Sequence, residues 1–143
     1  MLVRLLWGIA DTHAHPFAHE AFGGLFFQGA AADEAGIAAA LGSCQEGHGL
    51  AGLGDLIGNV LAGRKGHSHK GYPEFNAWPA WNTYNHQQMY YDWLKRAHAG
   101  GLRLLVAHAV NSEALCSLIE KKEGYSCDDM EAVDRQIAAA ESF

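Results

Sequence analysis

Short apolar runs alternate along the chain with stretches of helical spacing and with glycine-rich segments. The run 3–10 starts with a β-branched residue and is followed by polar residues and Pro16, which predicts a strand. The run 102–109 predicts a second strand by the same criteria. One face of this second strand would carry every other residue: Leu102, Leu104, Val106 and His108.

Between the two strands the spacing predicts three helices. Asp33 can cap a helix that runs to residue 41, and a weaker helix is expected over 53–61, where Gly54 and Gly58 each disfavour it by roughly 1 kcal/mol. Thr83 can cap a longer helix that ends near residue 99, before two glycines. The apolar stripe of this helix should face the core: Tyr90, Trp93, Leu94 and Ala97.

Two more helices are expected after the second strand. Asn111 or Ser112 can start the first of them. Its apolar positions are Leu115, Leu118 and Ile119. The segment 126–129, Ser-Cys-Asp-Asp, matches a capping box with aspartate in place of glutamate. The helix that it starts carries Met130, Val133 and Ile137 at helical spacing.

Two segments lack a regular period. Residues 22–32 are rich in glycine and phenylalanine, which predicts a loop packed on itself. Residues 62–82 predict a long irregular loop, of a length that is often functional. Trp78 and Trp81 either pin this loop to the body or line a substrate pocket. The basic cluster at 64–70 is expected to be a solvated part of the same loop.

Composition narrows the classes of partner. The chain has 143 residues, 49% of them hydrophobic, and a formal net charge of -6, which predicts a single domain over 1–143. The acidic balance argues against nucleic acid, because phosphate binding needs clustered Lys and Arg. No stretch approaches the roughly 20 apolar residues that cross a bilayer, so we expect no membrane partner.

Cysteine usage and the N-terminus bear on the compartment. The three cysteines are Cys44, Cys116 and Cys127, and none of them forms a Cys-x-x-Cys pair. A disulfide between Cys116 and Cys127 is compatible with an oxidising compartment. Without a recognisable signal peptide, however, we expect a reduced, cytoplasmic protein.

The first strand runs into Asp11-Thr12-His13-Ala14-His15, and this motif carries the most specific chemistry. Histidines at i and i+2 leave a strand on the same face, so both imidazoles can hold one metal ion. The alternative is a pair of polar residues in a turn closed by Pro16. His108, near the end of the second strand, could complete the ligand set if the strands are neighbours, or could simply bond a backbone carbonyl.

Other histidines and Cys44 offer weaker candidates. Cys44 with His48 four residues later could be a nucleophile and its base, although no third group orients them. His67 and His69 could bind a transition metal adventitiously. His86 is as readily a hydrogen-bonded core histidine as a metal ligand.

The segment 10–15, Ala-Asp-Thr-His-Ala-His, resembles the first strand of the amidohydrolase superfamily of metal-dependent hydrolases. More loosely, segments 17–19, 22–24, 86–94 and 102–104 resemble a bacterial branch related to membrane dipeptidase, some of whose relatives are secreted. The resemblance implies that the chain is the N-terminal part of a (β/α)8 barrel, because a whole barrel takes about 250 residues. The expected fold class is therefore α/β, a partial TIM barrel made of its first βα units, with long irregular loops and several helices.

The resemblance also implies a function. It predicts a divalent ion, most plausibly Zn²⁺, held by His13, His15 and His108, with Asp11 and His108 as candidate catalytic residues. The activity would be hydrolysis of an amide, ester or lactone bond in a small-molecule substrate through a metal-activated water. The alternative is a non-catalytic metal-binding fragment of such a barrel that associates into a homo-oligomer to cover its open edges.

Overall fold

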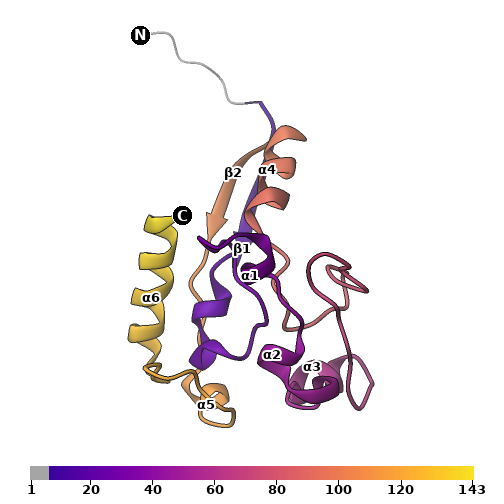
Figure 1. Ribbon diagram of the computed structural model, residues 1–143. Coiled ribbons are helices and arrows are strands. Elements are labelled where there is room, and N and C mark those ends of the chain that lie inside the picture. The colour runs from indigo at the N-terminus through magenta and orange to yellow at the C-terminus, as the bar shows by residue number, and fades with distance from the viewer. Residues whose placement is uncertain (1–6) are drawn as a thin grey trace.

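The computed structural model describes residues 7–143, and within that range its only sheet is a parallel pair of strands. Strand β1 (Ile9–Ala14) lies beside β2 (Leu102–Ala107), with Ile9 opposite Leu102 and Ala14 opposite Ala107 (Figure 1). The expected strands are thus neighbours, and the fold class is mixed α/β. Crossing from β1 to β2 takes most of the chain, which forms helices and loops to one side of the strands.

The first strand is shifted along the sequence from its expected position. Residues 3–6 of the expected run lie outside the described residues, and β1 continues to Ala14, so that His13 belongs to the strand and not to an exit loop. The reason is the partner strand, which offers backbone groups beyond residue 10. The amide of His108, just past β2, still donates to the Ala14 carbonyl oxygen at 2.8 Å.

Six α-helices flank the strands in the described part of the chain. They are α1 (Ile37–Ala40), α2 (Gln45–His48), α3 (Leu56–Leu61), α4 (Tyr91–Ala99), α5 (Glu113–Cys116) and α6 (Asp129–Ser142). Three 3-10 turns occupy Ala18–Glu20, Phe22–Gly24 and Leu50–Gly52. In Figure 1, α4 runs beside the strands, α6 stands on one flank of the body, and α2 and α3 lie on the opposite flank.

The two helices expected first are shorter than their patterns. Asp33 does not cap a helix, because its carboxylate accepts the Ala35 amide at 2.8 Å within a turn, and α1 begins only at Ile37. In the helix expected over 53–61, Asp55 provides the cap by accepting the Gly58 amide at 2.9 Å, and α3 begins at Leu56. Glycine content therefore limited both elements to one or two turns.

The helix expected over 83–99 is wrong in its first half. Thr83 closes a turn by donating its hydroxyl to the Ala80 carbonyl oxygen at 2.7 Å, and Asn85 adopts a left-handed conformation with φ of 58°. The Gln87 amide donates to the Gln28 carbonyl oxygen at 2.8 Å. Residues 83–90 thus bond to neighbouring loops, and helix α4 starts only at Tyr91.

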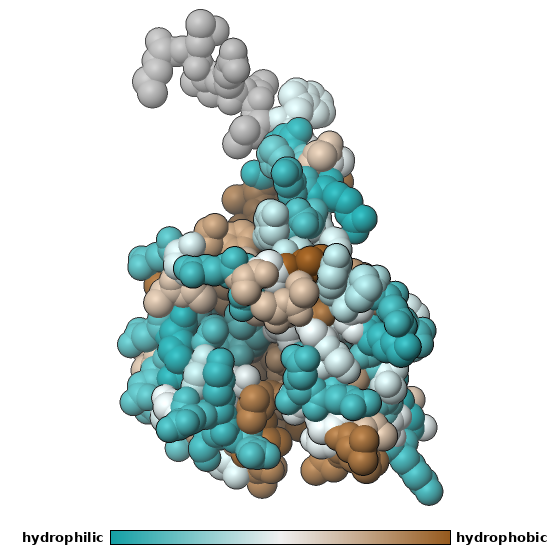
Figure 2. All heavy atoms as spheres, in the orientation of Figure 1, coloured by the Kyte–Doolittle hydropathy of each residue, from teal (hydrophilic) through white to brown (hydrophobic). Residues whose placement is uncertain are grey.

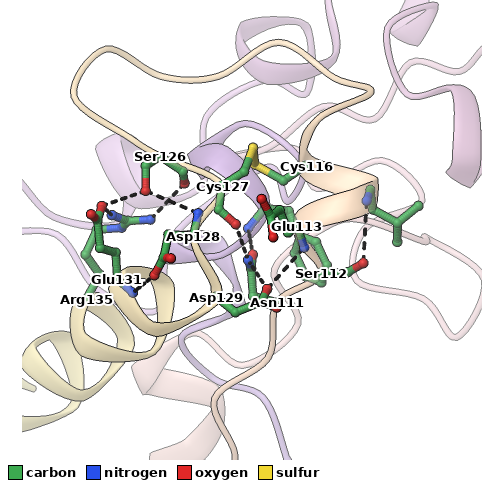
Figure 3. Close-up of a disulfide and its surroundings, with 12 residues drawn as sticks. Asn111, Ser112, Glu113, Cys116, Ser126, Cys127, Asp128, Asp129, Glu131 and Arg135 are labelled. Carbon is green, nitrogen blue, oxygen red and sulfur yellow. Dashed lines mark hydrogen bonds and ion pairs between the residues drawn. A yellow bond between two sulfur atoms is a disulfide. The ribbon is translucent and has the colours of Figure 1, made fainter.

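Both C-terminal helices form, but α5 ends at Cys116 and leaves Leu118 and Ile119, which the sequence placed in this helix, outside it. Ser112 caps α5, and Asp128 in place of Ser126 caps α6, accepting the amides of Met130 and Glu131 at 2.9 Å each. The disulfide Cys116–Cys127 ties the two helices together, so the reduced state expected from the sequence does not hold for this pair (Figure 3). Cys44 is a free, buried thiol.

Helix α6 packs through a face other than its apolar stripe. Ala132 and Gln136 are its buried residues, whereas Ile137 is 50% exposed. Gln136 explains this orientation, because its side chain accepts the Val110 amide at 3.0 Å and donates to the Val110 carbonyl oxygen at 2.9 Å. Two hydrogen bonds to the backbone after β2 therefore set the rotation of α6.

The main apolar cluster lies in the loop region rather than on the sheet. Leu41, Trp78 and Tyr90 form it together with Ala40, and the Trp78 indole donates to the Gln87 carbonyl oxygen at 2.7 Å. Trp78 thus pins the long loop to the body, which is one of the two roles the sequence left open. Of the stripe on α4, Tyr90 is buried, Trp93 and Leu94 are half-buried, and Ala97 is exposed.

Large apolar side chains remain exposed on two parts of the surface. On the strands, Ile9 and Leu104 are open to solvent, with Leu104 53% exposed. A second group lies at the end of the molecule that carries α3 and α5, where Figure 2 shows hydrophobic spheres gathered: Leu50, Leu53, Leu56, Val60, Leu61 and Leu118. Among the helices of the described range, none is both long and apolar enough to cross a bilayer.

Candidate functional site

The end of the parallel sheet brings together the three histidines singled out in the sequence. The rings of His13 and His108 lie 4.6 Å apart between centroids, and those of His13 and His15 lie 4.8 Å apart. The Nε2 atoms of His13 and His15 face each other at 3.1 Å. Neighbouring nitrogens that bind one tetrahedral Zn²⁺ lie about 3.3 Å apart, given Zn–N bonds of about 2.0 Å, so the spacing of the pair fits shared coordination.

Backbone carbonyls orient two of these rings. His15 donates from Nδ1 to the His108 carbonyl oxygen at 2.9 Å, which leaves its Nε2 as an acceptor. His108 donates from Nε2 to the Thr12 carbonyl oxygen at 3.1 Å. A metal ligand commonly anchors its second nitrogen in this way. His108 bonds a backbone carbonyl, as one of the two alternatives predicted, and it lies beside the pair. Its role as a third metal ligand stays a prediction.

Asp11 supports the turn that carries the pair. Its carboxylate accepts the His13 amide at 3.1 Å. This contact fixes the backbone of the ligand residue and keeps the carboxylate half-buried beside the histidines. Asp11 thus lies near the histidine pair and is bonded to backbone rather than to an imidazole. Its role in catalysis stays a prediction.

A cavity of about 480 Å³ opens beside His13 and His15. Its opposite wall is the segment 83–89, together with the indole of Trp81. Trp81 is 85% exposed, so it lines this cavity without being held in the core. Trp78 therefore pins the loop and Trp81 lines a cavity, whereas the binding of a substrate there stays a prediction.

A second cluster of histidines lies inside the loop region, and the sequence pattern did not single it out. Its rings pack edge to face or stacked with centroids 4.7 to 5.3 Å apart, and they belong to His48, His67, His69 and His86. His48 ends α2, whereas the other three come from the irregular segment that follows α3. All four are buried.

The expectation that 64–70 is a solvated loop is wrong for its histidines. Burial alternates along this segment, with His67 and His69 inside and Lys65, Ser68 and Lys70 exposed. The backbone explains the alternation: the His67 amide donates to the Ala51 carbonyl oxygen at 2.8 Å, and the His69 carbonyl accepts the Cys44 amide at 3.2 Å. The alternation of His67 and His69 with polar residues could have predicted their burial, but the neighbouring lysines made the segment look uniformly exposed.

Each imidazole of this cluster has defined partners. His48 donates from Nε2 to the Phe26 carbonyl oxygen at 3.0 Å, and His67 donates from Nδ1 to the Asn59 amide oxygen at 2.8 Å. His86 donates from Nδ1 to the Tyr84 carbonyl oxygen at 2.6 Å, and its buried Nε2 has no protein partner. His69 accepts from the Arg64 guanidinium at 3.3 Å.

Asp55 is the one acidic group in this cluster. It is 4% exposed, and its Oδ1 accepts the Gly58 amide at 2.9 Å and the Asn85 side-chain amide at 2.6 Å. Its Oδ2 is buried without a hydrogen bond, 3.9 Å from Nδ1 of His48 and 4.0 Å from Nδ1 of His67. Carboxylate and imidazoles therefore converge on one small volume.

Burial lowers the pKa of three imidazoles in this cluster, those of His67, His69 and His86. Loss of hydration lowers the pKa of His67 to about 4, helped by the nearby Arg64 charge, and lowers the pKa of His86 to about 3. Burial also raises the pKa of the Cys44 thiol. A raised pKa is the opposite of what a nucleophile needs, so the structure speaks against Cys44 with His48 as a catalytic pair.

Two groups of three side chains in this cluster have ligand atoms close enough to hold a metal ion. They are His48 with Asp55 and His67, and Cys44 with His67 and His86. Neutral imidazole, thiolate and carboxylate are the usual ligands of Zn²⁺. The protein thus has buried groups that could hold a divalent metal ion.

A short segment connects the two histidine regions. Asn85 donates to Asp55 in the buried cluster, and two residues later the Gln87 side chain donates to the Pro16 carbonyl oxygen at 2.9 Å, next to His15. His86 lies between them and lines both the cluster and the cavity.

Comparison with protein-family models, with curated proteins and with solved structures gave no significant match to this chain.

Proposed function

We propose that the protein is a metal-dependent hydrolase of amidohydrolase type, with its reaction centre at the end of the parallel strands. The observation that carries this proposal is the facing pair of Nε2 atoms of His13 and His15, 3.1 Å apart beside a cavity of about 480 Å³. In parallel α/β folds, active sites lie at the C-terminal ends of the strands. The position of the pair supports a barrel-derived site of this kind.

The donor set suits a catalytic rather than a purely structural metal. His13 and His15 would hold the ion, and the exposure of His13 on the cavity leaves positions open for solvent and substrate. A bound Zn²⁺ would supply Lewis acidity and would lower the pKa of its water to about 7. The substrate classes that this chemistry serves are amides, esters and lactones.

The neighbouring residues take positioning roles in this proposal. The Asp11 carboxylate holds the His13 backbone, and the His108 carbonyl oxygen fixes the tautomer of His15. Nδ1 of His108 stays available for proton transfer or as a further ligand, because its Nε2 is bonded to Thr12. Trp81 and Met89 on the opposite wall offer apolar surface for a small-molecule substrate.

The test compares the native chain with the His13→Ala/His15→Ala double variant. After dialysis, elemental mass spectrometry should show one fewer divalent ion per chain in the variant. Hydrolysis of a panel of aryl esters, lactones and N-acyl amino acids should be lost both in the variant and on chelation.

Two results would contradict the proposal. One is an equal metal content in both proteins, and the other is hydrolysis that persists in the double variant. The matched control is His98→Ala, which removes an exposed histidine from α4 and should change neither reading.

A second candidate is a non-catalytic metal-binding protein that self-associates. The observation that favours it is the exposed apolar surface on the strands and on α3. Open strand edges and apolar faces of this kind are commonly covered by association. Sedimentation equilibrium that shows a stable homo-oligomer, together with an absence of hydrolysis in the metal-loaded protein, would favour this candidate.

A further inference from the structure

A continuous chain of polar contacts runs through the buried cluster from one backbone carbonyl to another. It starts at the Gly52 carbonyl oxygen, which accepts the Asn59 side-chain amide at 2.7 Å. It continues from the Asn59 oxygen to Nδ1 of His67 at 2.8 Å, and from Nε2 of His67 to Nδ1 of His48 at 3.2 Å. It ends where Nε2 of His48 meets the Phe26 carbonyl oxygen at 3.0 Å.

This chain lacks one hydrogen. Both ends are carbonyl oxygens, which can only accept, and each of the three side chains between them contributes one hydrogen when neutral. Four contacts therefore share three hydrogens. Reversing the Asn59 side-chain amide or exchanging the His67 tautomer changes which contact lacks a hydrogen, but one contact always lacks it. With the end contacts satisfied, two lone pairs, on His48 and His67, face each other at 3.2 Å.

A cation at this contact would satisfy both lone pairs, and the third group nearby indicates which kind of cation fits. A proton between the two nitrogens would satisfy them and leave Oδ2 of Asp55 buried without a partner. A metal ion in contact with all three atoms satisfies every one of them. The separation of the two nitrogens matches the edge of about 3.3 Å expected for tetrahedral zinc.

We propose that His48, Asp55 and His67 form a second metal site, which binds Zn²⁺ through Nδ1, Oδ2 and Nε2 and fastens the loop region to α2 and α3. Each ligand already has the outer contact that metal ligands usually have: Phe26 for His48, Asn59 for His67, and Gly58 with Asn85 for Asp55. The ion would neutralise the buried carboxylate of Asp55. Within the described residues, no lysine or arginine lies closer to this carboxylate than the proposed ion would.

A small cavity provides the route and the fourth ligand. Its volume is about 120 Å³, and His48 and Asp55 line it with Phe26. Since a water molecule occupies about 30 Å³ of liquid, the cavity has room for a coordinated water. It lies apart from the sheet-end cavity, and none of its lining residues is His13 or His15. The site is therefore independent of the proposed reaction centre.

The experiment uses the full chain in the His13→Ala/His15→Ala background, which isolates the buried site. Metal-free protein is titrated with ZnCl2 in a calorimeter, and bound zinc is counted after gel filtration. We expect one zinc per chain. Adding Asp55→Asn, which keeps the shape and can still accept from Gly58 and Asn85 through its oxygen, should weaken binding at least tenfold. His48→Ala should abolish it.

Cys44→Ser is the matched control, because Cys44 belongs to the competing group with His67 and His86. The proposal expects unchanged zinc affinity in this variant. It is overturned if the double variant binds no zinc, if Asp55→Asn retains full affinity, or if Cys44→Ser loses the ion.

A spectroscopic measurement decides the matter if the His48 variant does not fold. Zinc X-ray absorption on the folded double variant should show only nitrogen and oxygen ligands at about 2.0–2.2 Å. A sulfur shell near 2.3 Å would place the ion at Cys44 and contradict the assignment.

Discussion

Two histidine pairs in this protein have almost the same geometry and different chemistry. At the sheet end, the facing nitrogens of His13 and His15 lie 3.1 Å apart, and in the loop region those of His48 and His67 lie 3.2 Å apart. The first pair is exposed to a cavity, and the second is buried. Distance alone would rank them equally as metal sites.

The two pairs differ in the acceptors to which their imidazole N–H groups donate. His13 has a protein partner only at Nε2 in the described structure, so it can place its hydrogen there and bond to His15 without any ion. Both members of the buried pair have given their hydrogen to another acceptor. An open pair can exchange water, ion and substrate, as a reaction centre requires, whereas the committed pair fits the resident cation proposed above. Counting hydrogens therefore separates a candidate catalytic site from a candidate structural one.

The largest effect is expected for alanine at Asp55, and alanine at Asp11 provides the comparison at the sheet end. Asp55→Ala removes the cap of α3, the partner of Asn85 and a proposed ligand, and should lower the free energy of unfolding by about 3 kcal/mol. Asp11→Ala removes one acceptor for the His13 amide and should cost about 1 kcal/mol. Urea unfolding of both variants measures the contrast, and equal losses would contradict it.

The disulfide should stabilise the protein without affecting the buried site. Cys116 and Cys127 are 11 residues apart, and closing a loop of that length is worth about 3 kcal/mol. The Cys116→Ser/Cys127→Ser variant should therefore unfold at lower urea concentration. The side chain of Asn111, which bonds the Cys127 carbonyl and the Phe22 amide, should lose order with it (Figure 3).

Zinc titration of the same variant tests the separation of the two regions. The affinity of the buried site should match that of the native chain, because none of its ligands contacts this disulfide. A parallel loss of zinc affinity would show that the two regions are coupled.

Acid should destabilise the metal-free protein through the buried cluster. The pKa of His67 is about 4 and that of His86 about 3 in the folded chain, against about 6.5 when unfolded. Between those values the unfolded state binds more protons, so stability is full above pH 6.5 and falls as the pH drops towards 4. For each histidine, the free energy of unfolding falls by at most about 1.4 kcal/mol per pH unit.

Urea midpoints at pH 7.5, 5.5 and 4.5 measure this fall. His86→Gln should make the dependence shallower, because one of the titrating groups is removed. A metal-free native protein whose midpoint does not change over this range would contradict the assignment of buried neutral imidazoles.

The smallest effect on stability is expected at the rim of the open site. Trp81 is largely exposed, so Trp81→Ala should change the free energy of unfolding by less than about 0.5 kcal/mol. If the sheet-end cavity binds substrate, the same variant should raise KM several-fold with little change in kcat. An unchanged KM would place the substrate elsewhere.

The sequence predicted the parallel strands and the gathering of His13, His15 and His108, because a local motif and an apolar run were enough to place them. It did not predict the course of residues 83–90, where hydrogen bonds to distant loops replace a helix that the spacing favoured. It predicted the helix α6 from its spacing, but not its rotation, which the hydrogen bonds of Gln136 set. Whether the strands belong to a barrel of amidohydrolase type stays a prediction.

The buried cluster was beyond reach for a different reason. Its buried side chains lie at 48, 55, 67, 69 and 86, a spacing with no local period, and only the path of the chain brings them together. Single residues were noticed, such as His86 and the pair His67 and His69, but nothing in the sequence linked them to Asp55. A long irregular loop can thus contain the most highly organised polar interior of the molecule.

The three residues 85–87 have a consequence for how the length of the chain can vary. Asn85 is bonded to Asp55 on one side and Gln87 to Pro16 on the other, so this three-residue segment is held at both ends. One inserted residue here would detach either the buried carboxylate or the turn that carries His15. Insertions at the exposed turn around Gly63 and Lys65 would disturb neither. Natural variation in length should therefore be found at that turn and be absent from 85–87.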